Sequence, residues 1–577
     1  MWKYFKEMKQ FGKELKEKQK EKNKESYDSI KEVEKTVEEA IQKVKDAGIA
    51  AERLHKRGEK TAWERIDYLC DEFLPLNTVY NPLFNKYGTT GVINGLAKIA
   101  GKWVSLIASD NKVLAGAWIP GQMENIFRAQ DIAETLRIPL VWVLNCSGVS
   151  LIEQDEVYAG RRSGGRTFFR HAELIQKGIP VIVGVYGTNP AGGGYHAISP
   201  AIIFAHKNGN MAVGGGGIVS GMSPSGGFSV ENVEPLIDAT RKFKAVPPGS
   251  VKIHHDETGF FKKVFDTEEG VLDAIRDYIE KYPAYDGEVF KVDDAKEPRF
   301  PQDDINYLVP FNQKMIYNMD EVIARLVDGS EHLEFKPDYG PEVYCGLVKL
   351  NGFLVGVIAN RQGFLGANYP EYAKGEYMGI GGKLYRQGLI KMNEFVTLCG
   401  RDRVPVVWLQ DTSGIDVGDT AEKAELLGLG MSLIYSIESS EVPMMCIVVR
   451  KGTAAAHYIM GGPQGNRNNA FTLGTPTTEI YVMHGETAAA AAFARRLVKE
   501  KDAGNPIEPV VEKMNALAQE YHDKSRPVYC AQKGFVDEIV PFDKIRDYLI
   551  AFAESSYQNP KSVCPHHQMM TPRVIKG

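Results

Sequence analysis

The chain has 577 residues, of which 43% are hydrophobic and 25% charged, with a formal net charge of −5 at pH 7. This length predicts two or more domains, and the composition is that of a globular protein. The small net charge predicts no nucleic-acid partner. We find no uncharged run of 18 apolar residues and no apolar segment after the N-terminal lysines, so we expect a cytoplasmic protein without a membrane span or secretory signal.

The seven cysteines are scattered and contain no CxxC pair, which predicts neither a zinc ribbon nor a disulfide framework. Cys564, His566 and His567 are the only grouping with metal-ligand character. Because other ligand types are missing nearby, we predict no metal.

The N-terminal segment, residues 1–55, is rich in Lys and Glu, and apolar residues from Ile30 to Val44 recur at helical spacing. This pattern predicts a helix, either on the solvated surface or in an oligomer contact. Residues 56–72 predict a second helix, with Ile66 and Leu69 on its buried side.

A first α/β domain is expected over residues 56–292. Strands are predicted within 91–110, as a hairpin, and at 140–146 and 181–186, with a helix at 121–137 between them. This alternation predicts a parallel-type layered sheet.

Residues 293–304, rich in Pro and Asp, predict a linker to a second domain at 305–577. There, 344–360 repeats the first hairpin, with Gly95 aligned to Gly346 at an offset of 251, and 383–403 is the counterpart of the helix at 121–137.

Two proline-led strands in each half show that the chain is duplicated. IPLVWVLNCSG and IPVIVGVYG begin at Pro139 and Pro180, and VPVVWLQDTSG and VPMMCIVVRKG at Pro405 and Pro443. The offsets are 266 and 263, far beyond the period of a solenoid repeat. The offset exceeds that of the hairpins, so the second copy carries extra residues between its hairpin and these strands.

The turn NCSG and the loop AGGGY predict a first oxyanion hole, because main-chain N–H groups at such turns can point at a negative oxygen. The expected donors are Val149 or Gly148 and Gly193 or Gly194, with Gly192 beside them. The alternative is that these glycines only make tight turns. The pairing of the two turns, repeated in the second half, favours the functional interpretation.

The second half has DTSGI and KGTAAAHY at the corresponding places, with Ile415 and Ala455 as expected donors. Gly414, Ala454 and Ala456 flank them. Since alanine is penalised at positive φ, we expect a helix-like or extended backbone in this loop.

The other polar residues near these turns give weaker indications of function. Ser147 and Ser413 do not lie in GxSxG, and most histidines placed like His196 and His457 are structural. Arginines between the first pair of strands either are solvated or bind a phosphate or carboxylate. They are Arg161, Arg162, Arg166 and Arg170, beside His171, and Arg450 and Lys451 precede the second loop.

At these residues the chain resembles the carboxyltransferase subunits of biotin-dependent enzymes, over nearly its whole length. The matching segments are SDNKVLAGAWIPGQ, VLNCSGV, GTNPAGGGYHAISP, IGGKLYRQGLIKMNEFVTLC, RKGTAAAHY, GGPQGN and YQNPKSVCPHHQM. The resemblance implies an α/β fold of duplicated crotonase-like domains (ClpP/crotonase superfamily) after the N-terminal helical segment. The chain lacks the zinc ribbon of one family branch, and alanines replace a Gly-Gly pair in the second loop.

The resemblance implies that the first domain binds an acyl-CoA thioester at Val149 and Gly193, and the second binds biotin through Ile415 and Ala455. The implied reaction moves the distal carboxyl group of glutaconyl-CoA to biotin. Methylmalonyl-CoA and propionyl-CoA are the alternative substrates. A biotin-independent hydratase or hydrolase and a non-enzymatic scaffold are the rival classes, but no Glu pair stands near the first hole.

The resemblance also implies partners. Neither Lys391–Met392 nor Lys513–Met514 has the context of a biotinylation site, so biotin is expected on a separate carrier subunit. Any sodium pumping is expected in a membrane-embedded partner subunit, which would place this chain at the membrane periphery. The family architecture implies a homo-oligomer with sites between subunits.

Overall fold

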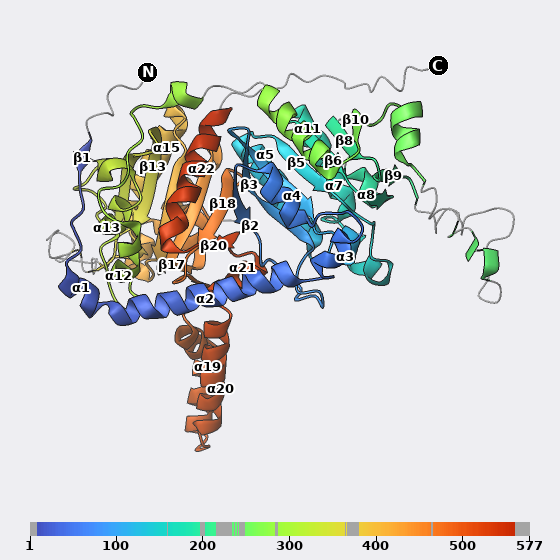
Figure 1. The fold of residues 1–577 in the computed structure, drawn as a ribbon. Helices are drawn as coiled ribbons and strands as arrows, with labels where there is room; N and C mark the ends of the chain where they lie inside the picture. The colour runs from blue at the N-terminus through green and yellow to red at the C-terminus, as the bar shows by residue number, and fades with distance from the viewer. Residues whose placement is uncertain are drawn as a thin grey trace. The chain divides into compact units, whose positions relative to one another are not determined.

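The computed structural model describes residues 8–158, 160–196, 202–214, 233–235, 237–238, 241, 248–282, 287–363, 365, 380–462 and 465–559. They form two compact units, each with its own large β-sheet (Figure 1). The N-terminal unit covers residues 42–286, and the C-terminal unit covers residues 287–557 together with the chain before residue 42. The predicted α/β class is confirmed.

The N-terminal unit has a seven-stranded sheet in the order β10-β8-β6-β5-β4-β3-β2. The hairpin side is antiparallel, and the strands from β4 to β10 are parallel, as predicted. Its strands are β2 (Glu72–Leu76), β3 (Val92–Ile99), β4 (Lys102–Ser109), β5 (Leu140–Leu144), β6 (Val181–Val185), β8 (Ile202–His206) and β10 (Lys263–Phe265), and a small second sheet pairs β7 (Thr188–Pro190) with β9 (Asn210–Ala212).

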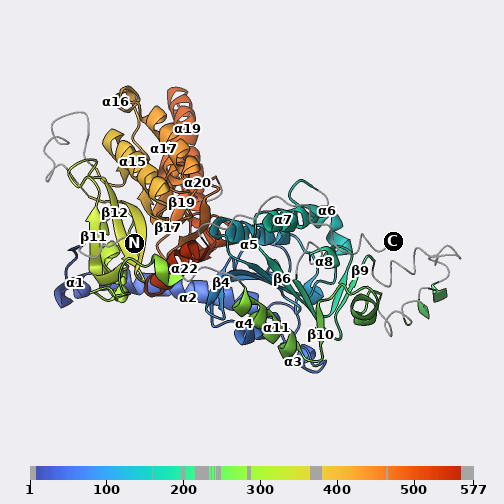
Figure 2. The same cartoon turned by 90° about the horizontal axis from the view of Figure 1, so that it is seen from above.

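Helices cover both faces of this sheet (Figure 2). On one face, α4 (Ala62–Leu69) and α11 (Glu268–Lys281) bury Ile66, Leu69 and Ile275 against alternate strand residues. On the other face lie α5 (Gln122–Leu136) and α7 (Gly164–Gln176), whose apolar side chains pack with Trp142. The short helices are α3 (Ala51–His55), α6 (Gln154–Val157) and α8 (Gly192–Tyr195).

The C-terminal unit has a nine-stranded sheet in the order β1-β11-β12-β13-β15-β17-β18-β20, with β19 paired to β17. Its strands are β1 (Lys9–Gln10), β11 (Glu331–Glu334), β12 (Val343–Leu350), β13 (Phe353–Asn360), β15 (Val406–Thr412), β17 (Met444–Thr453), β18 (Asn469–Gly474), β19 (Glu479–Tyr481) and β20 (Glu538–Ile539), and a small sheet pairs β14 (Lys383–Leu384) with β16 (Gly414–Ile415).

In the helical part of this unit, α15 (Arg386–Asp402) lies beside α17 (Leu426–Ser439), where Asn393 donates to Ser432. A hairpin of α19 (Gly485–Asp502) and α20 (Glu508–Asp523) stands out from the unit's sheet (Figure 1). The remaining helices are α1 (Glu17–Lys22), α2 (Lys24–Asp46), α12 (Ile305–Leu308), α13 (Met319–Ala324), α16 (Asp419–Lys423), α18 (Ala454–Ile459), α21 (Pro527–Lys533) and α22 (Ile545–Gln558).

The duplication is visible in the turns of the two hairpins. Ala100 and Gly101 join β3 to β4 with φ of 50° and 75°, and Asn351 and Gly352 join β12 to β13 with φ of 49° and 80°. Two consecutive left-handed residues make the turn that fits the twist of a two-residue hairpin. The extra residues of the second copy include 366–379, which lie outside the described residues.

The structure refines the sequence predictions for the helix around Ile30 and for residues 293–304. The helix predicted around Ile30 is α2, and Ile30 and Val37 are buried rather than solvated. Residues 293–304 have no helix or strand apart from a short 3-10 turn, but they are not a free linker. Asp293 accepts from Lys349 at 2.6 Å, and Asp304 pairs with Arg325 at 3.3 Å, so charge pairs attach this stretch to the C-terminal unit.

Glu342, at the start of β12, predicts a pH dependence of stability. Burial raises its pKa from near 4.5 to about 7, and its Oε1 accepts from the Gly388 N–H at 2.9 Å. The folded chain therefore holds a proton that the unfolded chain loses, and stability should fall by about 3 kcal/mol as pH rises from 4.5 to 7. Denaturant unfolding of Glu342→Gln, measured across this pH range, should lack that slope, whereas Glu512→Gln, a change at an exposed carboxylate, should retain it.

Candidate active site

The first turn pair consists of residues 145–149, after β5, and 191–195, which include α8. The two turns touch. The Cys146 N–H donates to Asn189 Oδ1 at 2.7 Å, and a Cβ placed on Gly193 would lie 2.2 Å from the Cys146 carbonyl oxygen. No real Cβ tolerates that distance. Glycine at position 193 therefore lets the two backbones meet.

The main-chain pairing of Gly148 and Ser150 with Trp118 does not use the N–H of Val149. Trp118 N donates to Gly148 O at 2.8 Å, and Ser150 N donates to Trp118 O at 3.0 Å. In parallel pairing the intervening N–H points away from the partner segment. Gly148 has a φ of 97°, which turns the chain sharply just before it. Val149 therefore presents a main-chain donor beside the second turn.

The other turn presents the start of α8. Ala191 has a φ of 46° and donates through its N–H to Ala212 O at 2.6 Å. The N–H groups of the following residues lie at a helix start, where they have no intrahelical acceptor. Gly193 and Gly194 are buried there. Both predicted sources of donors thus meet in the first turn pair.

Trp118 touches both turns, a feature that the sequence prediction missed. Its backbone brackets Val149, and its indole N–H donates to His196 Nε2 at 2.6 Å, at the end of α8. A Cβ on Gly192 would lie 2.7 Å from the indole ring. The offset of 266 could have revealed this position, because Leu384 is its counterpart beside Ile415.

We expect Trp118→Phe to lower kcat about tenfold with little change in KM for acyl-CoA, because a lost hydrogen bond of this kind costs about 1 kcal/mol and loosens the spacing of the donors. Steady-state kinetics measure the split. Trp63→Phe is the matched control, since the buried Trp63 N–H has no hydrogen-bond partner among the described residues. An equal loss in both variants would contradict a positioning role.

The second turn pair, residues 411–415 and 453–458, repeats this geometry. Asp416 N donates to Leu384 O at 3.1 Å, so the Ile415 N–H faces away from β14, as the Val149 N–H faces away from Trp118. Gly414 has a φ of 116°, matching Gly148. The backbone is thus the same in both halves.

The alanine loop corrects one prediction. We expected alanine to exclude positive φ, but Ala454 has a φ of 51°, as its counterpart Ala191 has 46°. Ala455 and Ala456 are helical, as expected. The matching kinks align Gly193 with the buried Ala456 and Gly192 with the exposed Ala455. One strained residue is tolerated because the flanking strand and helix over-determine it.

A buried ion pair supports the second turn pair. Asp411 and Arg450 are both buried, and Arg450 Nε donates to Asp411 Oδ2 at 2.8 Å. Arg450 also donates to the carbonyl oxygen of Met315 at 2.8 Å. The counterpart of Asp411 in the first half is the neutral Asn145. The buried ion pair is therefore specific to the second half.

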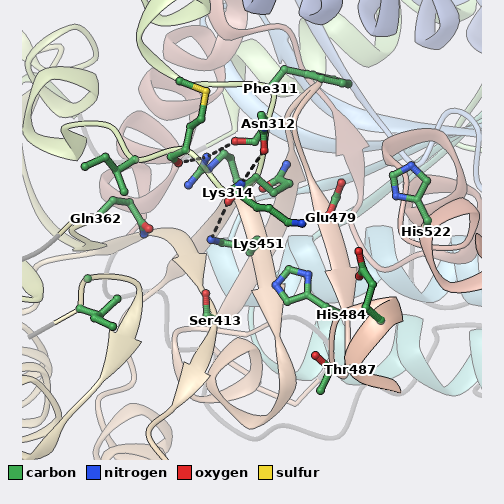
Figure 3. A pocket seen from close by; sticks show the side chains of 18 of the residues that line it. Phe311, Asn312, Lys314, Gln362, Ser413, Lys451, Glu479, His484, Thr487 and His522 are labelled. Carbon is green, nitrogen blue, oxygen red and sulfur yellow. Dashed lines mark hydrogen bonds between the residues drawn. The ribbon is translucent and has the colours of Figure 1, made fainter. Parts of the chain in front are cut away.

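A cavity of about 1170 Å³ opens beside the second turn pair (Figure 3). Ser413 and Lys451 reach it from the ends of β15 and β17, and Glu479 from β19. Residues 311–316, and His484 at the start of α19, complete much of the wall. Neither group was predicted, although the alanine run at 488–492 is a strong helix signal for α19.

The histidines of the turns and Ser147 are held by structural contacts. Desolvation lowers the pKa of His457 to about 4 and the pKa of His196 well below its ordinary value, which keeps both rings neutral. His457 Nδ1 bonds to Gln410 Oε1 at 2.7 Å, and Ser147 Oγ donates to Leu114 O at 2.8 Å. These contacts suit positioning rather than acid–base catalysis.

The arginine run is mostly engaged by carboxylates. Arg162 donates twice to Glu124, Arg166 pairs with Glu173, and Arg170 pairs with Asp131. Only Arg161 is exposed without a side-chain partner in the described part of the chain. It remains the candidate for an anionic group of the ligand.

The described residues contain no group of three His, Cys, Asp or Glu side chains placed to hold a metal ion. The predicted alternative at Cys564, His566 and His567 lies outside them. None of the helices in this part of the chain is long and apolar enough to cross a bilayer.

The chain matches a known protein family. The model of the carboxyl transferase domain family matches residues 53–570. The chain belongs to this family. It is 56% identical to glutaconyl-CoA decarboxylase subunit alpha of Acidaminococcus fermentans, covering 100% of this chain and 97% of that protein. It is also 26% identical to the biotin-dependent 3-methylcrotonyl-coenzyme A carboxylase beta1 subunit of Mycobacterium tuberculosis, over 85% of this chain and 87% of that one.

A solved structure shows the same fold. The geranyl-CoA carboxylase beta subunit of P. aeruginosa superposes with a TM-score of 0.77 at 22% identity, covering 98% of this chain and 100% of that chain. The predicted fold, family and enzyme class of this carboxyltransferase are therefore confirmed.

Proposed function

We propose that this carboxyltransferase removes the distal carboxyl group of glutaconyl-CoA, passes it to biotin on a separate carrier subunit and releases crotonyl-CoA. The observation that carries the proposal is the full-length similarity, at 56% identity, to a glutaconyl-CoA decarboxylase alpha subunit. The two turn pairs agree with it, because the reaction requires two polarised oxygens to be held close together.

The first turn pair suits the acyl-CoA. When the carboxyl group leaves, the electron pair of its C–C bond enters a dienolate whose charge reaches the thioester oxygen. Donors at Val149 and at Gly193 or Gly194 would bind that oxygen more strongly as its charge grows, and this difference lowers the barrier. Gly148 and Gly192 shape the turns, and Arg161 is the candidate for a CoA phosphate.

The second turn pair suits the ureido ring of biotin. Ile415 would present one main-chain donor for the ureido oxygen. The other would come from Ala455, the predicted donor, or from Ala456, which the matching kinks align with Gly193, with Gly414 and Ala454 shaping the loop. The cavity beside them has both apolar and polar side chains in its lining and is large enough for such a ring. Biotin, when bound, supplies the nitrogen that accepts the carboxyl group. The chain's own contribution is to bind and orient the ring.

We infer that the sites are completed in a homo-oligomer. Large apolar side chains are exposed beside both turn pairs, at Leu151, Ile152 and Tyr195 in the N-terminal unit and at Leu427, Met431, Tyr435 and Tyr458 in the C-terminal unit. Exposed apolar patches of this kind mark interaction surfaces. A site between the N-terminal unit of one copy and the C-terminal unit of another would cover both.

The remaining partners follow from the proposed reaction. Biotin would arrive on a carrier subunit, and a membrane-embedded decarboxylase subunit would use the transferred group for sodium transport. The chain would then be cytoplasmic and peripherally attached to that complex.

The test is incubation of the purified chain with glutaconyl-CoA and free biotin, with crotonyl-CoA measured by chromatography. We expect product that depends on biotin. Product from methylmalonyl-CoA but not from glutaconyl-CoA would replace the substrate, and lack of product from both, with a folded chain, would refute the proposal. Purified carrier subunit in place of free biotin should raise the rate.

A substitution in the second turn pair tests whether that turn pair binds biotin rather than acyl-CoA. We expect Ala455→Val to raise KM for free biotin roughly tenfold and to leave KM for acyl-CoA and the melting temperature unchanged, because Ala455 is exposed at the start of α18. Kinetics with each substrate varied in turn measure this. A change in KM for acyl-CoA alone would place biotin elsewhere.

A further inference from the structure

The cavity beside the second turn pair lies wholly within the C-terminal unit, where the parallel strands β13, β15, β17 and β19 end (Figure 3). Open α/β sheets bind ligands at the carboxyl ends of their strands. Gln362, Ser413 and Lys451 follow or close three of these strands. The place and the size of the cavity both fit a small-molecule site.

The walls of the cavity carry more positive than negative groups. Lys314, Arg450, Lys451 and Arg526 line it, against the carboxylates of Glu479 and Glu486. Asp411 cancels the charge of Arg450, so three cations remain against two carboxylates, and this small surplus favours an anionic ligand. Arg450 is not available to that ligand, because its guanidinium is already bonded to Asp411 and to the Met315 carbonyl oxygen.

Lys451 is the cation best placed to bind an anion. Its side chain is 8% exposed, and its ammonium is 3.5 Å from the Gln313 carbonyl oxygen and 3.7 Å from Asp411 Oδ1. Asp411 is already neutralised by Arg450 at 2.8 Å. An ammonium carries three N–H donors, and a buried charge is costly unless it is well bonded. Two long contacts leave Lys451 able to bind a strong acceptor.

An unbonded acceptor lies on the same wall. The side-chain oxygen Oε1 of Gln313 is buried and has no hydrogen-bond partner among the described residues, while its amide nitrogen donates to Thr477 O at 2.9 Å. A ligand that offers both a carboxylate and an N–H would match Lys451 and Gln313. A cyclic urea with a carboxylate on one nitrogen has both groups.

We propose that this cavity binds the carboxylate that the reaction places on the ureido ring of biotin, with Lys451 as its charged partner. The inference rests on the proposed function and adds a subsite to it. Ser413 belongs to the second turn pair and also lines the cavity, so a ring held at that turn pair can extend its nitrogen substituent into the cavity that Lys451 lines. Buried Lys451 discriminates by charge, whereas exposed Lys314 is screened by water.

Calorimetry on the full chain tests the proposal with two stable probes of nearly equal shape, one with a carboxylate and one with a neutral amide in its place. They are (2-oxoimidazolidin-1-yl)acetate and the corresponding neutral acetamide. Hydrogen bonds to charged groups are worth enough to predict roughly 10- to 100-fold tighter binding of the acid by the wild-type chain. Lys451→Met should abolish this preference, and Lys451→Arg should retain most of it. Lys501→Met, at an exposed lysine of α19 that does not line the cavity, is the matched control that should leave it intact.

Equal binding of the two probes by the wild-type chain would overturn the proposal, as would a preference that survives in Lys451→Met. If Lys451→Met does not fold, Lys451→Gln gives the same comparison. Failure of the proposed function is a separate result. A wild-type chain that prefers the acid but forms no crotonyl-CoA keeps the subsite and loses the substrate, whereas one that forms crotonyl-CoA without the preference keeps the function and loses the subsite.

Discussion

Replacing Gly193 by valine should abolish turnover of acyl-CoA, and replacing it by alanine should lower kcat by about 10²- to 10³-fold. A single Cβ at this position would lie 2.2 Å from the Cys146 carbonyl oxygen and 3.2 Å from its Sγ. Both atoms belong to the facing turn, so the two turns must separate. Loss of one preorganised oxyanion donor has an effect of this size.

Steady-state kinetics with acyl-CoA measure the loss, and thermal unfolding shows whether the chain remains folded. Gly165→Ala is the matched control, because a Cβ there meets no atom within 4 Å. It should retain wild-type kcat. Nearly full activity in Gly193→Val would show that the turns do not supply the donors.

Replacing Arg450 by methionine should destabilise the C-terminal unit by about 3–5 kcal/mol. The change removes the 2.8 Å partner of the fully buried Asp411 and leaves it only the longer contact to the Lys451 ammonium at 3.7 Å, and breaking a buried ion pair costs this much. It also releases the carbonyl oxygen of Met315. Hydrogen exchange in peptides from β15 and β17 measures the local effect without assuming that the two units unfold together.

Adding Asp411→Asn to Arg450→Met should restore much of that stability. The counterpart turn of the first half holds Asn145, and the counterpart of Arg450 is Gly187, so a neutral turn of this shape exists in the same chain. Arg401→Met is the surface control. Arg401 pairs with Asp402 but is 67% exposed, and such pairs are worth at most about 1 kcal/mol. A double variant as unstable as Arg450→Met would exclude the ion pair as the cause.

The backbone repeat could be predicted from local sequence. The proline-led strands, the Gly148 and Gly414 turns and the hairpins at Gly101 and Gly352 all depend on short-range preferences of apolar runs and glycine. The linker was less predictable. Residues 293–304 lack periodicity, yet Asp293 is bound to Lys349, and no local signal reports a partner 56 residues away.

The candidate site, like the fold, could be predicted from local sequence only in part. The candidate donor positions follow from the turns, but the positive φ of Ala454 does not, since alanine by itself disfavours it. Trp118 was missed because its role depends on Gly148 and His196, which come close only in the folded chain. Lys451 was predicted only as part of a basic pair, because its burial is a tertiary property.

The amino-acid sequence by itself determined the duplicated α/β architecture, the two turn pairs and the family, because these depend on periodicity, turn residues and extended motifs. Only the tertiary structure decided how the halves differ. It shows that Gly193 is required by a backbone contact and that Ala456, not Ala455, takes the corresponding place. It also shows that Arg450 is occupied by Asp411 while Lys451 faces a cavity. These distinctions arise from long-range packing and desolvation, which short stretches of sequence do not encode.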